Sequence, residues 1–450
     1  MTERPRSGVR VTAARAYIVH VHFKDRRGSD RARDGRAPAA RLEEAKGLAA
    51  AIRLDVAQAA IASIDRPHPG KLLREGKVAE IGAEIEALKP DLVIVDGHLS
   101  PVQQQNLEKR WKAKVIDRTG LILEIFGARA RTSEGGLQVE LAALSYQRSR
   151  LVRSWTHLER QRGGFGFLGG PGESQIEADR RHIDTRLAGI RKQLTDVIRT
   201  RELHRAERRK VPYPIVALVG YTNAGKSTLF NRLTAAQVYA ENLLFATLDP
   251  TMRRVELPNG QIVILSDTVG FISDLPHELV AAFSATLEEV KQADLIIHVR
   301  DVAHPESAEQ KADVARVLHE LGVGYEDGAA IVDAHNKVDL LDADGRAAAA
   351  NRAARQSDTV MISAKSGEGC TDLLAAIDRK LAGGRATCDV RIPIADGATL
   401  AWLYRHGQVI ERRDDDDYAY VRVSLAPPDR DRLKRRTGSR VRVNEDASAR

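Results

Sequence analysis

The chain has 450 residues, long enough for about three domains, and its 43% hydrophobic and 29% charged residues are ordinary for a globular protein with real cores. Its two cysteines, Cys370 and Cys388, exclude a disulfide framework or a zinc cluster, as expected in a reducing cytoplasm. No apolar run is long enough to span a membrane, and the basic residues 1–15 are not followed by the apolar core of a secretion signal.

The net charge of +8 is concentrated in one part of the chain. Residues 147–210 contain 16 Lys and Arg against 8 Asp and Glu, so the rest of the chain carries 54 of each sign. A basic stripe beside a neutral body is typical of proteins that bind the phosphate backbone of a nucleic acid. A solvated helical face that only keeps the protein soluble would have the same charge, so both interpretations stay open.

Residues 1–135 are predicted to form an α/β domain with a parallel sheet, because strands alternate with helices. The predicted strands are 16–23, 91–96 and 115–117. The predicted helices are 39–63, 71–88, a helix that begins at Ser100-Pro101, and 121–130. The arginine-rich residues 26–36 are predicted to be a flexible loop.

Residues 136–210 are predicted to form an antiparallel helical hairpin with a glycine-rich tip loop at 163–172, which is too rich in glycine to be helical. Phe165, Phe167 and Leu168 at this tip would stack on bases if they are exposed; alternatively, they fold back on the hairpin. Apolar residues recur at heptad-like spacings in both helices, at Leu137, Leu141, Leu144, Leu151, Trp155 and Leu158, and at Ile176, Ile183, Leu187, Ile190 and Leu194.

Residues 211–384 are predicted to form a second α/β domain, and residues 385–450 a small β-containing appendage with an acidic turn at Asp414–Asp417. The second domain is predicted to contain a hairpin turn at Pro258-Asn259-Gly260. Its predicted strands are 215–219, 253–257, 261–266, 295–300, 330–334 and 359–362, and its predicted helices are 228–233, 276–292, 306–321, an alanine-rich helix before 359, and 371–381.

A phosphate-binding loop is predicted after the strand at 215–219. Its spacing is G-x-x-x-x-G-K-S, in which the glycines let successive N–H groups point at an anion near a helix N-terminus. Lys226 is expected to reach the β- and γ-phosphates, and the Ser227 hydroxyl to ligate magnesium. The loop consists of Gly220, Tyr221, Thr222, Asn223, Ala224, Gly225, Lys226 and Ser227.

Three further motifs follow predicted strands in the order that guanine-nucleotide switches require. In Asp267-Thr268-Val269-Gly270, the carboxylate would hold a magnesium-bound water and the Gly270 N–H would meet the γ-phosphate. In Asn336-Lys337-Val338-Asp339, the final carboxylate would accept both the N1–H and the 2-amino group of guanine, which adenine lacks. Ser363-Ala364-Lys365 would close over the base. The ordered set predicts a P-loop domain that binds GTP rather than ATP.

A switch loop is predicted between the first helix of this domain and its second strand, at Phe245-Ala246-Thr247-Leu248-Asp249. The Thr247 hydroxyl would complete the magnesium shell only when the γ-phosphate is present, which makes the loop a two-state element. Thr251 is the alternative ligand and ranks second. The predicted cofactor is therefore Mg²⁺, with Ser227 and Thr247 as protein ligands.

The catalytic group is not identified by sequence. Many switch GTPases keep a water-orienting Gln after the motif glycine, but this chain has Phe271 there. An apolar side chain cannot position water, so intrinsic hydrolysis is expected to be slow. Asn223 in the phosphate loop is a candidate to help seat a monovalent cation such as K⁺, and a partner that orders the switch loops is the other candidate for assistance.

These motifs resemble those of the HflX GTPases. The resemblance extends from about Tyr17 to Leu381 and includes Arg118-Thr119, Gln138-Val139-Glu140-Leu141, residues 163–173, the phosphate loop, residues 245–251 and residues 267–271. It implies a cytoplasmic, magnesium-dependent GTPase that binds the large (50S) ribosomal subunit, splits stalled ribosomes and directs its hairpin tip toward the peptidyl-transferase centre. The family has also been linked to ATP use by the N-terminal domain, but this chain has no second phosphate loop.

Three functional interpretations follow from these observations. The first is a GTP-driven ribosome-splitting enzyme whose basic hairpin contacts ribosomal RNA. The second is a GTPase that escorts immature large subunits during their assembly. The third is an RNA-binding module whose affinity is regulated by GTP. In each case the expected protein is a monomer without a membrane span.

Overall fold

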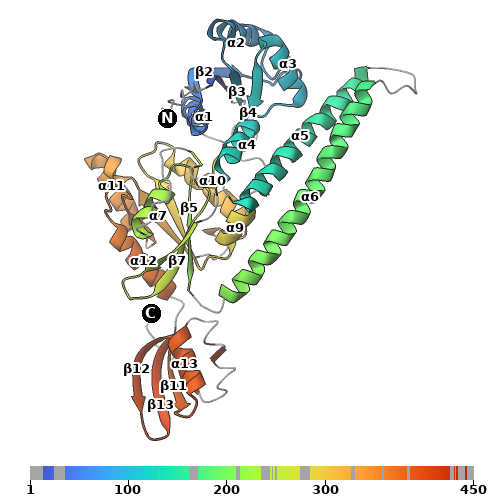
Figure 1. Ribbon diagram of the computed structural model, residues 1–450. Coiled ribbons are helices and arrows are strands. Elements are labelled where there is room, and N and C mark those ends of the chain that lie inside the picture. Colours follow the sequence, from blue (N-terminus) through green and yellow to red (C-terminus); the bar gives the residue numbers. More distant parts are fainter. Residues whose placement is uncertain are drawn as a thin grey trace, which may run out of the picture.

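The computed structural model describes residues 14–24, 36–130, 132–161, 171–208, 213–234, 244–245, 247–248, 251–273, 284–325, 330–356, 358–382, 386–425, 430, 432–433 and 441–442. These residues form three β-sheets and a long helical hairpin (Figure 1). The N-terminal sheet lies at one end of the molecule, the nucleotide-domain sheet in the middle and the C-terminal sheet at the other end. None of the described helices is both long and apolar enough to cross a bilayer.

The N-terminal sheet is entirely parallel, as the sequence predicts, with strand order β2-β1-β3-β4. Helix α3 begins with a capping box in which Ser100 and Gln103 satisfy each other's backbone N–H groups. The strands are β1 (Arg15–Phe23), β2 (Asp55–Ile64), β3 (Leu92–Asp96) and β4 (Lys114–Asp117), and the helices are α1 (Pro38–Ala51), α2 (Glu75–Leu88), α3 (Pro101–Trp111) and α4 (Arg118–Arg129).

The predicted helix at 39–63 is wrong beyond Ala51. The chain turns at Arg53, whose φ is +59°, and then enters strand β2. β2 pairs in parallel with all of β1, and this pairing outweighs the helical preference of its alanines. Helix α2 also begins later than predicted, because residues 68–72 form a tight bridged turn.

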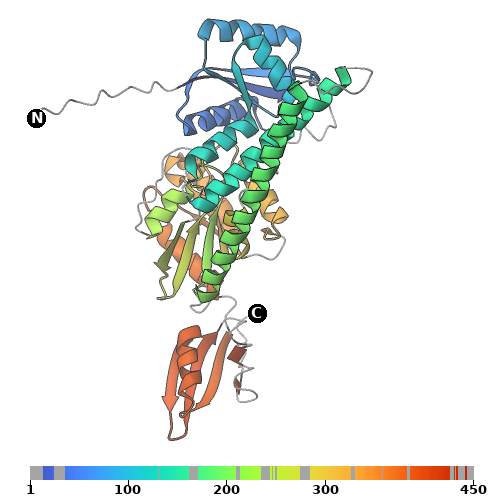
Figure 2. The same cartoon turned by 45° about the vertical axis from the view of Figure 1, so that its right-hand side comes forward.

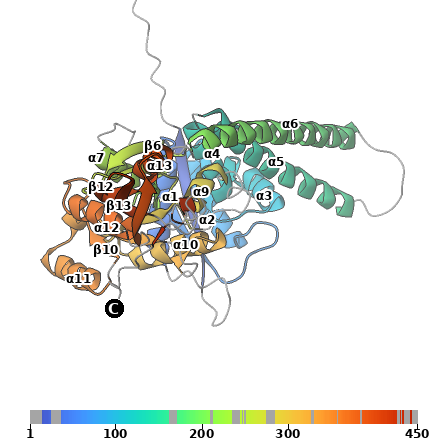
Figure 3. The same cartoon turned by 90° about the horizontal axis from the view of Figure 1, so that it is seen from below.

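The hairpin consists of α5 (Ser133–Gln161) and α6 (Pro171–Arg208), which pack side by side along most of their length (Figure 2). Leu187 and Ile190 of the predicted seam are buried, and Arg186 makes a two-pronged ion pair with Glu140 at 2.7 and 2.9 Å. Seen from below, the two helices project to one side of the molecule (Figure 3). The predicted tip residues Phe165, Phe167 and Leu168 lie outside the described residues.

The nucleotide domain contains a six-stranded sheet of order β10-β9-β8-β5-β7-β6, in which only β6 is antiparallel to its neighbour. The predicted helix at 276–292 is described only as α9, and residues 274–283 lie outside the description. The elements are β5 (Ile215–Val219), α7 (Lys226–Thr234), β6 (Thr251–Glu256), β7 (Ile262–Asp267), α9 (Ser284–Lys291), β8 (Leu295–Asp301), α10 (Ser307–Glu320), β9 (Ile331–Asn336), η3 (Val338–Leu340), α11 (Ala343–Ala354), β10 (Thr359–Met361) and α12 (Cys370–Ala382).

The C-terminal region forms an antiparallel sheet of order β12-β13-β11-β14 and one helix that the sequence analysis missed. Asp396 begins this helix by accepting from the Thr399 N–H at 3.0 Å. The elements are β11 (Ala386–Pro393), α13 (Gly397–His406), β12 (Gln408–Asp414), β13 (Tyr418–Leu425) and β14 (Val441–Arg442).

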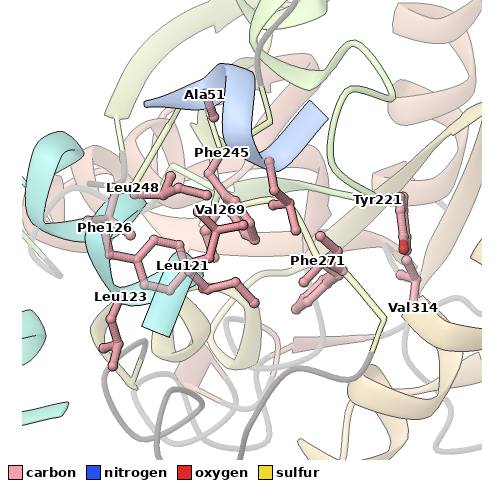
Figure 4. Packing of buried hydrophobic residues seen from close by; sticks show 14 of the residues in the cluster. Ala51, Leu121, Leu123, Phe126, Tyr221, Phe245, Leu248, Val269, Phe271 and Val314 are labelled. Atoms are coloured by element: carbon pink, nitrogen blue, oxygen red, sulfur yellow. The ribbon is translucent and has the colours of Figure 1, made fainter. Parts of the chain in front are cut away.

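The N-terminal and nucleotide domains share one hydrophobic core. Phe126 of α4 meets Phe245 of the switch loop edge-to-face, with ring centroids 4.9 Å apart (Figure 4). Val269 and Phe271 are buried in the same cluster. Arg36, assigned to a flexible loop by sequence, is instead buried between the domains, whereas residues 26–35 of that loop lie outside the description. The nucleotide site is therefore packed directly against the N-terminal domain.

Candidate functional site

The phosphate loop connects the buried end of β5 to the N-terminus of α7, as its sequence predicts. Two glycines are required by their surroundings. At Gly220 (φ +150°) a Cβ would lie 2.2 Å from the Val299 carbonyl oxygen, and at Gly225 (φ +97°) it would lie 2.2 Å from the Asn336 Nδ2 atom. Only glycine allows this close approach and backbone conformation.

A cavity of about 520 Å³ opens above this loop. Residues from all the predicted motifs meet in it, together with Thr228 and Leu340, which the sequence analysis did not select. The lining consists of Thr222, Asn223, Gly225, Lys226, Ser227, Thr228, Phe245, Thr247, Thr268, Gly270, Asn336, Lys337, Asp339, Leu340, Ala364 and Lys365. Of the other predicted residues, Ala246 and Asp249 lie outside the description. The remaining ones are sequence neighbours of the lining residues: Gly220, Tyr221, Ala224, Leu248, Asp267, Val269, Val338 and Ser363.

Lys226 is buried at the floor of the cavity. Its ammonium donates to the carbonyl oxygens of Gly220 at 3.1 Å and Tyr221 at 2.8 Å. Burial lowers the pKa of Lys226 to about 8, although the nearby Asp267 carboxylate opposes the shift. An anion bound in the cavity would stabilise the charged form of this buried lysine.

Three oxygens converge beside Lys226. The Ser227 hydroxyl lies 2.7 Å from Asp267 Oδ2 and 2.8 Å from the Thr247 hydroxyl, which is itself 2.9 Å from Oδ2. Asp267 Oδ1 is buried without a hydrogen-bond partner in the described structure, and burial raises the pKa of this carboxyl. Two hydroxyl oxygens beside a buried carboxylate are hard oxygen donors of the kind that fit Mg²⁺. Thr251, the alternative ligand, is the first residue of β6 and pairs with Asp267 in the ladder.

The opposite end of the cavity is built by Asn336 and its neighbours. The Asn336 side chain donates to the Ala224 carbonyl at 2.8 Å and accepts from the Ala364 N–H at 2.9 Å, so it ties the phosphate loop to the residue 363–365 loop. Lys337 (φ +67°) is held by an ion pair of 2.7 Å to Asp301. Asp339 is exposed in η3 and faces the cavity. The arrangement leaves its carboxylate available to a ligand's hydrogen-bond donors.

Phe271 is attached to the phosphate loop by two backbone hydrogen bonds. The Phe271 N–H donates to Gly220 at 3.1 Å, and the Thr222 N–H donates to the Phe271 carbonyl at 2.8 Å. The Phe271 side chain is 2% exposed and packs in the shared core. Gly270 has no room for a side chain, because a Cβ would lie 2.9 Å from Thr222 Cα and 3.0 Å from Lys226 Nζ. The ring of Phe271 therefore cannot act on water in the cavity.

A buried polar network that sequence reasoning missed links the site to the N-terminal domain. The Tyr221 hydroxyl donates to Glu44 of α1, and Glu44 also pairs with Arg118 of α4. Arg118 donates in turn to the Ser273 carbonyl at 3.2 Å, and Arg36 pairs with Asp313 of α10. Although burial opposes its ionisation, Arg118 keeps the pKa of Glu44 below its usual value. No spacing in the sequence signals these contacts, because they join segments far apart in the chain.

Comparison with known proteins gives consecutive family matches. Residues 39–127 match the model described as GTP-binding GTPase N-terminal, 129–208 the GTP-binding GTPase Middle Region, 215–337 the 50S ribosome-binding GTPase, and 348–447 the HflX C-terminal domain. These matches and the cavity geometry identify the middle of the chain as a GTP-binding P-loop domain and the protein as a GTPase.

Individual relatives match most of the chain. The GTPase HflX of Magnetococcus marinus is 50% identical over 386 residues, which cover 86% of this chain and 88% of that protein. The GTPase HflX of Escherichia coli K12 is 42% identical over 422 residues, which cover 92% and 93%. The GTPase HflX of Caldanaerobacter subterraneus is 43% identical over 360 residues, which cover 80% and 81%. The chain belongs to the HflX family of GTPases.

Proposed function

We propose that this GTPase binds GTP with magnesium in the 520 Å³ cavity and couples its GTP state to binding and splitting of the ribosome through its large subunit. The observation that carries the proposal is that one molecule contains both this cavity and a basic helical hairpin, which packs against the N-terminal domain. The match of residues 215–337 to a family described as a 50S ribosome-binding GTPase supports the choice of partner.

The proposed nucleotide contacts are those predicted from the motifs. The N–H groups of the phosphate loop and the N-terminus of α7 surround the phosphates, and Lys226 exchanges its carbonyl partners for phosphate oxygens. Asp339 accepts from the guanine edge, while Asn336 fixes the position of the loops on either side of the base. The base contact gives specificity, since adenine lacks the paired donors.

Ser227 and Thr247 are the proposed protein ligands of the magnesium ion, and Asp267 orients both hydroxyls by accepting from them. When bound, Mg²⁺ neutralises charge that develops on the β- and γ-phosphates. Thr247 lies in the same loop as Phe245, and Phe245 contacts Phe126 of the N-terminal domain. Ordering of this loop by the γ-phosphate would therefore change the contact between the two domains. This contact gives the GTP state a physical route to the rest of the molecule.

The hairpin is the proposed ribosome-binding element. Helix α6 has 38 residues and is therefore about 57 Å long, enough to reach deep into a ribosomal cavity. The excess of 8 positive charges in residues 147–210 suits ribosomal RNA. In this proposal, residues 163–172 at the tip act on the ribosome. The protein works as a cytoplasmic monomer, and its domain boundaries lie at about residues 135, 210 and 384.

Sedimentation of intact ribosomes with the protein and GTP tests this function. We expect dissociation into subunits with the wild type, no dissociation with Lys226→Ala, which removes the phosphate contact, and none after deletion of 163–172, which spares GTP hydrolysis. Binding only to precursor large subunits would replace splitting with a role in subunit assembly. Equal binding to ribosomes in the empty, GDP and GTP states would contradict coupling altogether.

A further inference from the structure

The loop at residues 363–367, at the base end of the cavity, is bound by an arginine that lies outside the nucleotide motifs. Arg232 of α7 donates from Nε to the Ala364 carbonyl oxygen at 3.3 Å and from Nη2 to the Lys365 carbonyl oxygen. Its guanidinium carbon lies 3.7 Å from the position that a Cβ on Gly367 would occupy. Ala364 and Lys365 line the cavity, whereas Arg232 does not. Arg232 therefore contacts the loop from outside the cavity.

Helix α7 and this loop also share an apolar core. Leu229 and Phe230 of α7 are buried in the same cluster as Ala364 and Leu373. Close packing of this kind resists changes in the distance between the two segments. The helix that begins at the phosphate loop therefore also supports the loop at the base end of the cavity.

Among the backbone N–H groups of residues 363–367, the one of Lys365 differs from the others. In the part of the chain that the structure describes, it has no hydrogen-bond partner. It is therefore the donor of this loop that a ligand in the cavity can use. The other four donate as follows: Ser363 to the Glu368 carbonyl at 2.9 Å, Ala364 to Asn336 Oδ1 at 2.9 Å, Ser366 to the Ser363 hydroxyl at 3.1 Å and Gly367 to the Ser363 carbonyl at 2.8 Å.

The direction of the Lys365 N–H depends on Arg232. The peptide bond between Ala364 and Lys365 is trans and planar, so its carbonyl oxygen and its N–H point in opposite directions. Arg232 binds that carbonyl oxygen, and the N–H consequently points away from the guanidinium. The second bond of Arg232, to the next carbonyl, restrains the rotation of this peptide plane.

We propose that Arg232 is a positioning residue for guanine specificity, because its two bonds turn the Lys365 N–H toward the 6-oxo group of the base. The inference rests on the proposed function, which places a guanine base at this end of the cavity. Guanine has an acceptor at its 6-position, whereas adenine has an amino donor there, which would leave the N–H unpaired. A site built to donate to one acceptor rejects analogues that lack it.

The test measures how well three nucleoside diphosphates displace a fluorescent GDP from the full-length protein. In 6-thio-GDP a sulfur, which is a weaker acceptor, replaces the 6-oxo oxygen, while IDP lacks only the 2-amino group. Arg232→Met removes both donors but keeps a long side chain that favours helix. Its preference for GDP over 6-thio-GDP should be roughly fivefold smaller than that of the wild type, the value of one hydrogen bond. Its preference for GDP over IDP, which reports Asp339, should equal that of the wild type.

Arg253→Met is the matched control. Arg253 is exposed on β6, at the opposite edge of the sheet from β10, so the variant removes the same charge far from the loop and should keep both preferences. Arg232→Lys retains the charge but lacks the planar fork of N–H groups, so it should resemble Arg232→Met. Wild-type preferences in Arg232→Lys would show that charge alone acts, and would overturn the inference.

An unchanged preference for GDP over 6-thio-GDP in Arg232→Met would overturn the inference. An equal fall in both preferences would also overturn it, because it would indicate general loosening of the site. A wild type that binds 6-thio-GDP as tightly as GDP would show that the Lys365 N–H does not meet the base, with the same consequence. A wild type that binds IDP as tightly as GDP would instead reject the proposed contact of Asp339, while the 6-thio-GDP comparison would still decide the role of Arg232.

Discussion

The hydroxyl of Tyr221, inside the phosphate loop, donates a hydrogen bond of 2.5 Å to Glu44 on helix α1 of the N-terminal domain. The same oxygen accepts from the backbone N–H of Ser273, just beyond the Phe271 segment, and from Arg36, both at 3.0 Å. One hydroxyl therefore joins the phosphate loop, the segment that follows Gly270 and the N-terminal domain. Tyr221 was selected by the motif as a nucleotide-site residue, but its side chain serves the domain interface.

Tyr221→Phe should destabilise the protein, because Glu44, Arg36 and the Ser273 N–H each lose a partner in a buried site. The expected cost is about 1–3 kcal/mol, the usual penalty for leaving buried polar groups unsatisfied. Thermal denaturation followed by circular dichroism would show this as a transition that begins at lower temperature than in the wild type.

Tyr213→Phe provides the comparison for that measurement. Tyr213 precedes β5, and its ring receives the Arg254 guanidinium at 5.2 Å. The loss of its hydroxyl leaves that ring contact in place, so its melting curve should match the wild type. If Tyr221→Phe melted with the same curve as Tyr213→Phe, the Tyr221 hydroxyl would not connect the domains in solution.

The nucleotide domain was predictable because its chemistry is encoded in short local motifs. Each motif lies at the end of a strand, and parallel strands bring these ends to one edge of the sheet, where Gly270, Asn336 and Lys226 line the same cavity. Contacts between domains carry no such signal. Glu44, Arg118 and Ser273 lie in three separate segments, and only folding shows that they touch.

The misassigned strand has a related cause. Residues 55–64 read as helical because alanine recurs at Ala57, Ala59, Ala60 and Ala62, and alanine is the best helix former. In the fold, parallel pairing with the whole length of β1 holds these residues extended at the edge of the N-terminal sheet. The missed helix α13 did have a local signal, the Asp396 N-cap three residues before Thr399.

Nucleotide affinity should fall as pH rises above about 8, because burial lowers the pKa of the free Lys226 to that value. Phosphates bind the charged ammonium, so binding above this pH must take up a proton, and affinity should decline by up to about tenfold per pH unit. Titration with a fluorescent guanine nucleotide between pH 7 and 9 measures this slope.

GMP, which has no β- or γ-phosphate, reports any contribution from ionisation of the base itself and should show a flatter profile.

The stability of the empty protein should change with pH in the opposite direction to its nucleotide affinity. Because the folded-state pKa lies below the ordinary 10.5, the empty protein gains stability from this group as pH rises from about 8 to 10.5. Constant GTP affinity up to pH 9 would mean that the lysine stays charged in the empty site.

Asp339→Asn should exchange guanine for xanthine specificity. The carboxylate is exposed at the cavity, so the substitution leaves the fold intact, but an amide cannot accept both guanine donors. Loss of such a paired contact lowers GTP affinity by up to about 10⁴-fold, whereas xanthosine triphosphate gains affinity because its 2-oxo group accepts from the new amide. Competition between the two triphosphates measures the change. Asp344→Asn, on the exposed start of α11, is the control, and an equal effect there would indicate a nonspecific charge effect.

Potassium should accelerate GTP hydrolysis over sodium. Phe271 is buried in the shared core and cannot orient water, so charge on the phosphates must be stabilised by another group. Asn223 lines the cavity with φ +60° and carries an amide oxygen that suits a monovalent cation next to the phosphates. We expect the rate of GTP hydrolysis to rise by up to about 10²-fold in potassium, in line with the value of one charge-stabilising group in a transition state.

Asn223→Gly keeps the left-handed backbone but removes the amide, so this variant should still bind GTP and hydrolyse it at one rate in both salts. Equal wild-type rates in potassium and sodium would leave a partner that orders the switch loops as the source of catalytic assistance.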